Sequence, residues 1–315
     1  MSAKGLSSRA IIGAFYARLA QGAGGWAEPL SMYVGSDQES ETYKWLGMSP
    51  VMREWVGGRQ AKGFRENGIT IANKPFEATL EVLVDELRRD KTGQILVRVN
   101  EMADRANAHW LRLLSALILN GGASVCYDGQ YFFDTDHSEG DSGAQSNAIS
   151  VDISALPVSS HGSIAAPSVG ELNLAIMQAV QTIMSFKDDQ GEPMNETAAD
   201  FLVMVPTSLW MAAASALKSP VIDGGDTNVI TSMDGFRINL RQNPRLNSWT
   251  SKFAVFRADG NVKPFIRQEE VPVQVSAIAE GSELEFKERK HQYGIYASGN
   301  AGYGYWQHAV QVELT

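Results

Sequence analysis

The chain has 315 residues, 44% hydrophobic and 20% charged, and its 27 basic and 36 acidic residues give a net charge of −9. These values are typical of a folded protein of roughly two domains and exclude fibrous and disordered classes. A net-negative chain is also poorly suited to general binding of nucleic acid or anionic membranes. The single cysteine, Cys126, has no internal disulfide partner, so we expect folding in a reducing cytosol. Neither a signal peptide nor a membrane span is predicted, because the uncharged, apolar run 201–217 is short and contains Pro206.

The first 50 residues are rich in Gly, Ser and Ala and show little periodicity. They carry six aromatic residues, so we expect an extended arm that packs against another surface. Residues 59–85 are predicted to form a two-stranded β-ribbon with a hairpin turn at Asn67-Gly68, where both residues accept positive φ. Apolar and charged residues alternate over 76–82, and this gives the ribbon one apolar face that needs a partner.

A long helix is predicted from Gly93 to Asn120, where apolar residues recur every three or four positions. Its length is about 42 Å at 1.5 Å per residue. We expect this helix to be continuous and to form the structural axis of the subunit. Its apolar face, with Leu114 near the middle, is expected to pack on a sheet of C-terminal strands.

Downstream segments alternate between strand and helix. The stretch SVCYDGQYFF (124–133) is predicted to form two strands around a turn at Asp128-Gly129, followed by a polar connection over 138–168. The other predicted elements are a helix capped by Ser168 and Glu171, a buried strand at 201–205, a helix at 206–217 and strands throughout 253–315, including ELEFKERKHQYGIYA. This order predicts an α+β fold in which one domain is inserted in another.

Catalytic chemistry has weak support in the sequence. Asp134, Asp136 and His137, with His161 downstream, are candidate ligands for a divalent cation, but a solvated turn after a hairpin explains the same residues. Cys126 is more simply a buried thiol than a nucleophile. No phosphate-binding loop, nucleophile elbow or zinc-protease motif occurs. We therefore expect neither catalytic turnover nor a required metal or cofactor.

Three stretches together are similar to one known family. They read MSPVMREWVGGRQAKGFRENGITIANKPFEATLEV (48–82), VCYDGQYFFDTDH (125–137) and HQYGIYASGNAGYGYWQHA (291–309). From about residue 45 to its C-terminus, the chain resembles the major head subunit of Mu-like phages.

The resemblance implies the Hong-Kong-97-type major capsid fold. The implied parts are an N-terminal arm (1–55), an extended β-hairpin loop (56–84), a peripheral domain with the long spine helix (85–164 and 263–315) and an inserted axial domain (165–262). Such subunits form pentamers and hexamers of an icosahedral shell around double-stranded DNA. The implied location is the virion, after assembly in the bacterial host cytoplasm. The implied partners are other copies of the chain, portal, scaffold and decoration proteins, and DNA bound without sequence specificity, with no membrane.

Charge is unevenly distributed, which suggests where copies of the chain meet. Residues 1–75 hold nine basic and six acidic residues, a net of +3, and the remainder holds eighteen and thirty, a net of −12. A positive arm and loop that reach a negative neighbour would favour correct pairing. The expected assembly contacts in the loop are Arg59, Lys62, Arg65, Asn67, Gly68 and Lys74.

Two other functions remain open at this point. One is an encapsulin-like compartment, which shares the fold and encloses cargo enzymes. The other is a metal-dependent enzyme that uses Asp134, Asp136 and His137.

Overall fold

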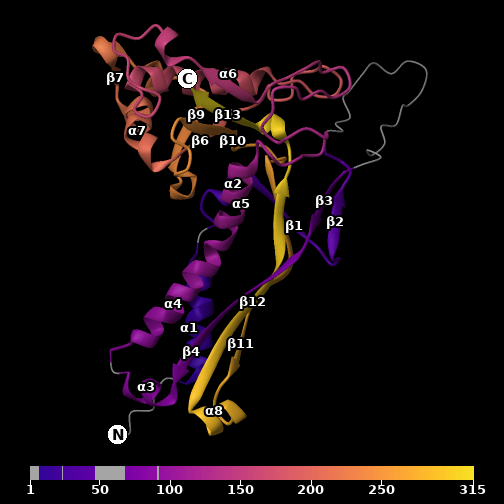
Figure 1. The fold of residues 1–315 in the computed structure, drawn as a ribbon, viewed down its shortest axis with the longest axis vertical. Helices are drawn as coiled ribbons and strands as arrows, with labels where there is room; N and C mark the ends of the chain where they lie inside the picture. Colours follow the sequence, from indigo (N-terminus) through magenta and orange to yellow (C-terminus); the bar gives the residue numbers. More distant parts are fainter. Residues whose placement is uncertain (1–6, 23, 47–67, 91) are drawn as a thin grey trace, which may run out of the picture.

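The computed structural model describes residues 7–22, 24–46, 68–90 and 92–315. The molecule is elongated, with a broad lobe at one end and a long, narrow leg of helix and sheet below it (Figure 1). The C-terminus lies in the lobe. This shape follows from two separate sheets, one in each part.

The leg is built on a four-stranded sheet in the order β1-β11-β12-β4. Its strands are β1 (Ser31–Gly35), β11 (Phe265–Ile278), β12 (Lys290–Tyr303) and β4 (Lys74–Leu83). The β11–β12 and β12–β4 pairs are antiparallel, whereas β1 runs parallel to β11. The predicted ribbon over 59–85 is therefore only partly correct, because its second strand, β4, pairs with the C-terminal β12.

The lobe contains a five-stranded sheet in the order β5-β13-β10-β6-β9. Its strands are β5 (Ala148–Val151), β13 (Ala309–Leu314), β10 (Lys252–Arg257), β6 (Asp200–Val205) and β9 (Arg237–Gln242). Helices α6 (Val169–Ser185) and α7 (Trp210–Lys218) lie in the same lobe, as does the small β7–β8 pair (Val221–Ile222 and Asp226–Thr227). The predicted strand at 201–205 and the capping box at Ser168 and Glu171 are confirmed.

The long predicted helix is present but divided at Ala108 into α4 (Gln94–Asn107) and α5 (His109–Asn120). The expectation of one continuous helix is therefore wrong. Ala108 has ψ of −4°, yet its N–H still donates to Asp104 O at 2.9 Å and its carbonyl accepts from Arg112 N at 3.1 Å. The helix thus changes course with little loss of backbone hydrogen bonding, and α4 and α5 together run along the leg (Figure 1).

The division matches two separate hydrophobic cores. Helix α5 packs on β12 and contributes Leu114 and Ile118 to the main core, which extends through the lobe. Helix α4 packs on α1 and β4, and its buried face joins a smaller core in the leg. That core consists of Ile11, Phe15, Val82, Leu87, Ile95, Val99, Ala103 and Tyr293.

The N-terminal segment is helical over α1 (Ser8–Gln21), so the expectation of an extended arm is wrong for these residues. Helix α1 packs against α4, where Arg18 Nε donates to Asp104 Oδ1 at 2.7 Å. Its apolar residues Ile11, Phe15 and Leu19 recur every four positions, a helical signal that the surrounding glycines obscured. The short α2 (Ala27–Leu30) then leads into β1.

Two further local predictions are wrong. Residues 124–133 form a tight loop with one bridge between Val125 and Tyr131, because Gly129 at φ 93° reverses the chain within four residues. The segment ELEFKE forms helix α8 (Glu283–Glu288), which reverses the chain between β11 and β12. Helix α3 (Val84–Arg89) follows β4 and lies at the same end of the leg as α8 (Figure 1).

Candidate assembly surfaces

A two-stranded ribbon projects beside the leg sheet (Figure 1). It pairs β2 (Ser40–Tyr43) with β3 (Ile69–Ala72) in antiparallel register. The fully buried Gln268 of β11 fastens this ribbon, since its Oε1 accepts from Tyr43 Oη at 2.8 Å. Its Nε2 donates to Ile71 O at 3.1 Å and to Asn73 Oδ1 at 2.7 Å. The role of Gln268 could not be predicted from the sequence, because nothing local distinguishes it from other strand glutamines.

The described residues that flank 47–67 meet at this ribbon, where Tyr43 pairs with Ile69. Gly68 lies so close to Tyr43 that a Cβ atom there would be 2.5 Å from Tyr43 O, which explains the need for glycine. The predicted turn at Asn67-Gly68 includes Asn67, which lies outside the described residues, so the turn stays a prediction. Lys74 begins β4, is exposed and is paired in register with Gly299. The other expected contacts, Arg59, Lys62, Arg65 and Asn67, lie outside the described residues.

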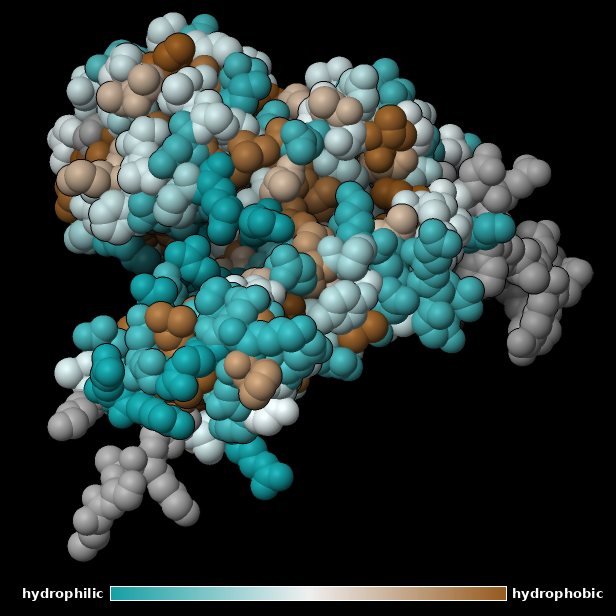
Figure 2. Space-filling model, turned by 60° about the horizontal axis from the view of Figure 1, so that its bottom comes forward, coloured by the Kyte–Doolittle hydropathy of each residue, from teal (hydrophilic) through white to brown (hydrophobic). Residues whose placement is uncertain are grey.

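Exposed apolar side chains mark further surfaces where other chains can pack. Phe286 of α8 is 89% exposed at the end of the leg, and Met211 of α7 is 75% exposed in the lobe. Around the end of the leg, polar residues dominate the surface in Figure 2. A phenylalanine so exposed among polar neighbours is a candidate contact with another protein surface.

A groove of about 400 Å³ lies between the long helices and the leg sheet. Its walls include apolar Phe76, Met102 and Trp110, with Arg98 and Arg112 on the helix side. The groove lies where the helix changes from α4 to α5, between the two hydrophobic cores. It is open to solvent and therefore available to a neighbouring chain.

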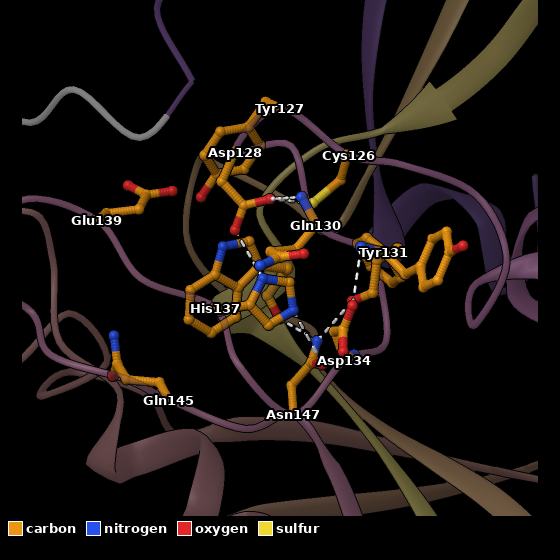
Figure 3. Close-up of polar contacts among 12 residues, drawn as sticks. Cys126, Tyr127, Asp128, Gln130, Tyr131, Asp134, His137, Glu139, Gln145 and Asn147 are labelled. Atoms are coloured by element: carbon orange, nitrogen blue, oxygen red, sulfur yellow. Dashed lines mark hydrogen bonds and ion pairs between the residues drawn. The ribbon is translucent and has the colours of Figure 1, made fainter.

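The residues considered for metal chemistry are only partly brought together. Asp134 accepts hydrogen bonds from its own loop, from Tyr131 N at 3.1 Å and from Thr135 N at 2.8 Å. Asp136 is exposed, and His161 instead contacts Glu171 Oε1 at 3.0 Å at the start of α6. His137 is the member of the group that is buried, and its ring contacts Asp128 instead of Asp134 or Asp136 (Figure 3). The predicted trio therefore does not form a site.

The fold is similar to those of solved shell proteins, and this likeness shows the fold. The procapsid of bacteriophage JBD30 matches with a TM-score of 0.55 at 22% identity, over 98% of this chain and 76% of that chain. A virus-like particle from Pyrococcus furiosus matches with a TM-score of 0.54 at 9% identity, over 97% and 98% of the two chains. The predicted α+β fold of the Hong-Kong-97 type, a major capsid fold, is confirmed.

The family follows from the sequence. The chain belongs to the family of the Mu-like prophage major head subunit gpT, whose model matches residues 8–156 and 239–315. It is 38% identical over 108 residues to the major capsid protein of Escherichia phage Mu, covering 34% of this chain and 35% of that protein. It is 33% identical over 111 residues to the Mu-like prophage FluMu major head subunit of Haemophilus influenzae, covering 35% of this chain and 36% of that protein. These matches span about a third of each relative.

The family match favours neither of the alternative functions. The family model leaves residues 157–238 unmatched, and these carry α6, β6 and α7 of the lobe. No helix within the described residues is long and apolar enough to cross a membrane.

Proposed function

We propose that this chain assembles with copies of itself into pentamers and hexamers that form an icosahedral phage head around double-stranded DNA. The observation that carries the proposal is the family match on both sides of the lobe insertion, in a chain with a capsid fold. Head-to-tail contacts repeated by rotation close into rings, and rings of this kind are the capsomers of a shell. The net charge of −9 suits a container, because a strongly basic lining would hold the DNA by its phosphates.

The proposed location is the virion, with assembly in the bacterial host cytoplasm. Portal and scaffold proteins are the proposed partners during assembly. The capsid of bacteriophage JBD30, 25% identical to this chain, is decorated with minor capsid protein trimers. A decoration protein is therefore a further proposed partner.

The domain division also remains a proposal: arm 1–55, extended loop 56–84, peripheral domain 85–164 and 263–315, and axial domain 165–262. The unmatched segment 157–238 supports an insertion at about the axial range. The five-stranded sheet draws β6, β9 and β10 from that range and β5 and β13 from the peripheral range. The two proposed domains would therefore share one sheet and move together in the lobe.

Electron microscopy of the purified protein tests the proposed function. Shells, rings or capsomers are the expected particles. A population of small, compact particles under all assembly conditions would contradict the proposal. Shells that contain cargo enzymes and no packaged DNA in the producing cell would favour the compartment instead.

We further propose that the positive loop contacts the negative body of a neighbouring subunit through Arg59, Lys62, Arg65, Asn67, Gly68 and Lys74. The described residues that flank 47–67 meet at the β2–β3 ribbon, so this segment begins and returns at one place on the subunit. Each exposed ion pair contributes only about 0.2–1 kcal/mol, but the contribution repeats around a ring.

Charge reversal of Arg59, Lys62 and Arg65 together should leave the subunit folded and reduce shell formation, most strongly at low salt. Sedimentation at low and moderate salt measures the effect. Reversal of Arg88, Lys218 and Arg245, which are exposed and lie outside both the loop and the groove, is the matched control for the change in net charge. A normal yield of shells with unchanged salt dependence would show that the loop charges have no part in assembly.

A further inference from the structure

The loop that follows α5 holds three side chains of different metal-binding chemistry at one point (Figure 3). Within the part of the chain that the structure describes, Cys126, Asp128 and His137 place a sulfur, a carboxylate oxygen and a ring nitrogen within 4.8 Å of one another. Cys126 Sγ donates to Asp128 Oδ1 at 2.9 Å, and His137 Nδ1 is 2.6 Å from Asp128 Oδ2. The side chains of His137 and Asp128 are 0% and 1% exposed.

The hydrogen bonds of Asn147 determine which nitrogen of His137 carries a proton. The Nδ2 of Asn147 donates to two carbonyls, Phe132 O at 2.7 Å and Trp306 O at 3.4 Å. Its Oδ1 accepts from Asp134 N at 2.8 Å, so this amide has one orientation. The same Oδ1 is 3.2 Å from His137 Nε2, and because it only accepts, Nε2 must carry the hydrogen.

A neutral His137 ring with its hydrogen on Nε2 has a lone pair on Nδ1. That lone pair faces the Asp128 carboxylate, which also offers only lone pairs. A cation is therefore required between the two groups, either a proton or a metal ion. Metal-ligating histidines characteristically donate their second N–H to an oxygen acceptor, as His137 does to Asn147.

The surroundings hold the His137 ring in place. The His137 ring stacks on Trp306 with centroids 3.9 Å apart and 8° between planes, which holds the Nδ1 atom toward the cluster.

We propose that Cys126, Asp128 and His137 form a buried structural metal centre for a transition-metal cation of the zinc type. Thiolate, imidazole and carboxylate together are a ligand set that suits Zn²⁺. On binding, the thiol and the contact between His137 Nδ1 and Asp128 Oδ2 each release one proton to solvent, and that contact is replaced by one bond from each atom to the metal. This centre shares only His137 with the trio considered from the sequence, and it replaces the expectation of a metal-free subunit.

The centre would connect the loop after α5 to the main core. Its ligands lie on that loop, and the stacked Trp306 lies directly before β13. Because the ligands are buried, the ion is expected to enter as the loop folds, so that metal binding and folding are coupled.

Metal analysis of wild-type protein purified without chelator should find about one equivalent of zinc per subunit. After removal of the metal, titration with Co²⁺ should produce the near-ultraviolet charge-transfer absorption of a cobalt–thiolate bond. Cys126→Ser should abolish this absorption, and Asp128→Asn should weaken binding at least tenfold.

The matched control is Asp136→Asn, which changes an exposed carboxylate on the same loop and should bind metal like wild type. Metal removal should lower the Tm by several degrees, and Zn²⁺ should restore it.

If the wild-type protein holds no metal and gives no cobalt–thiolate absorption, the proposal is wrong, and the cation between His137 and Asp128 is a proton. Unchanged cobalt absorption in Cys126→Ser would also overturn it. If that variant does not fold, the metal content and cobalt spectrum of the wild-type protein decide. None of these results depends on whether the subunit forms shells.

Discussion

Leu114→Asp should prevent the subunit from folding and should abolish its assembly. Leu114 is fully buried in α5, within the main core that joins the leg to the lobe. An unpaired carboxylate at this point costs several kcal/mol, a large part of the roughly 5–15 kcal/mol by which a domain is stable. Circular dichroism and sedimentation of the soluble fraction measure the outcome.

The matched control is Ala116→Asp, two residues further along the same helix on its exposed face. This substitution introduces the same residue, and therefore the same charge, into the same helix. It should leave folding and assembly close to wild type. A soluble Leu114→Asp protein that forms shells would contradict the assignment of α5 as the structural axis.

Gln268→Leu should release the β2–β3 ribbon from the leg sheet. The substitution removes three buried hydrogen bonds, to Tyr43, Ile71 and Asn73. Each buried group left without a partner costs about 1–3 kcal/mol, so the total loss is several kcal/mol. Hydrogen exchange at the backbone amides of β2 and β3 should become much faster, while exchange in the lobe sheet stays slow.

Gln274→Leu is the control for this change, because Gln274 is exposed on the same strand. Its effect on exchange in the ribbon should be small. Equal protection of β2 and β3 in wild type and Gln268→Leu would show that the ribbon is held by other contacts. Fast exchange together with a loss of shells would connect the ribbon to assembly.

Elements with strong local signals were predicted well from the sequence. Helix α6 begins at the Ser168 and Glu171 capping box, in which both reciprocal hydrogen bonds are present. The apolar periodicity of 93–120 correctly predicted helix, because the buried positions within each of α4 and α5 lie on one helical face. The division at Ala108 was not predictable, since it depends on two cores that the periodicity does not distinguish.

Segments whose structure depends on distant partners were predicted less well. Residues 283–288 alternate like a strand and are helical, because the chain must reverse there between β11 and β12. For the metal centre, the spacing of Cys126 and Asp128 is visible in the chain, but the approach of His137 is not. No local pattern indicates that Asn147 determines the protonated nitrogen of that ring.

The sequence by itself determined the family, the α+β class and most of the helices and strands, because motifs, caps and apolar spacing act over a few neighbouring residues. Only the tertiary structure decided that β3 pairs with β2, that β4 pairs with β12 and that α1 covers α4. It also decided that Gln268 fastens the ribbon and that Cys126, Asp128 and His137 meet. The physical reason is that strand partners and buried polar contacts join residues far apart in the chain. These pairings are selected by packing and by the need to satisfy every buried hydrogen-bonding group.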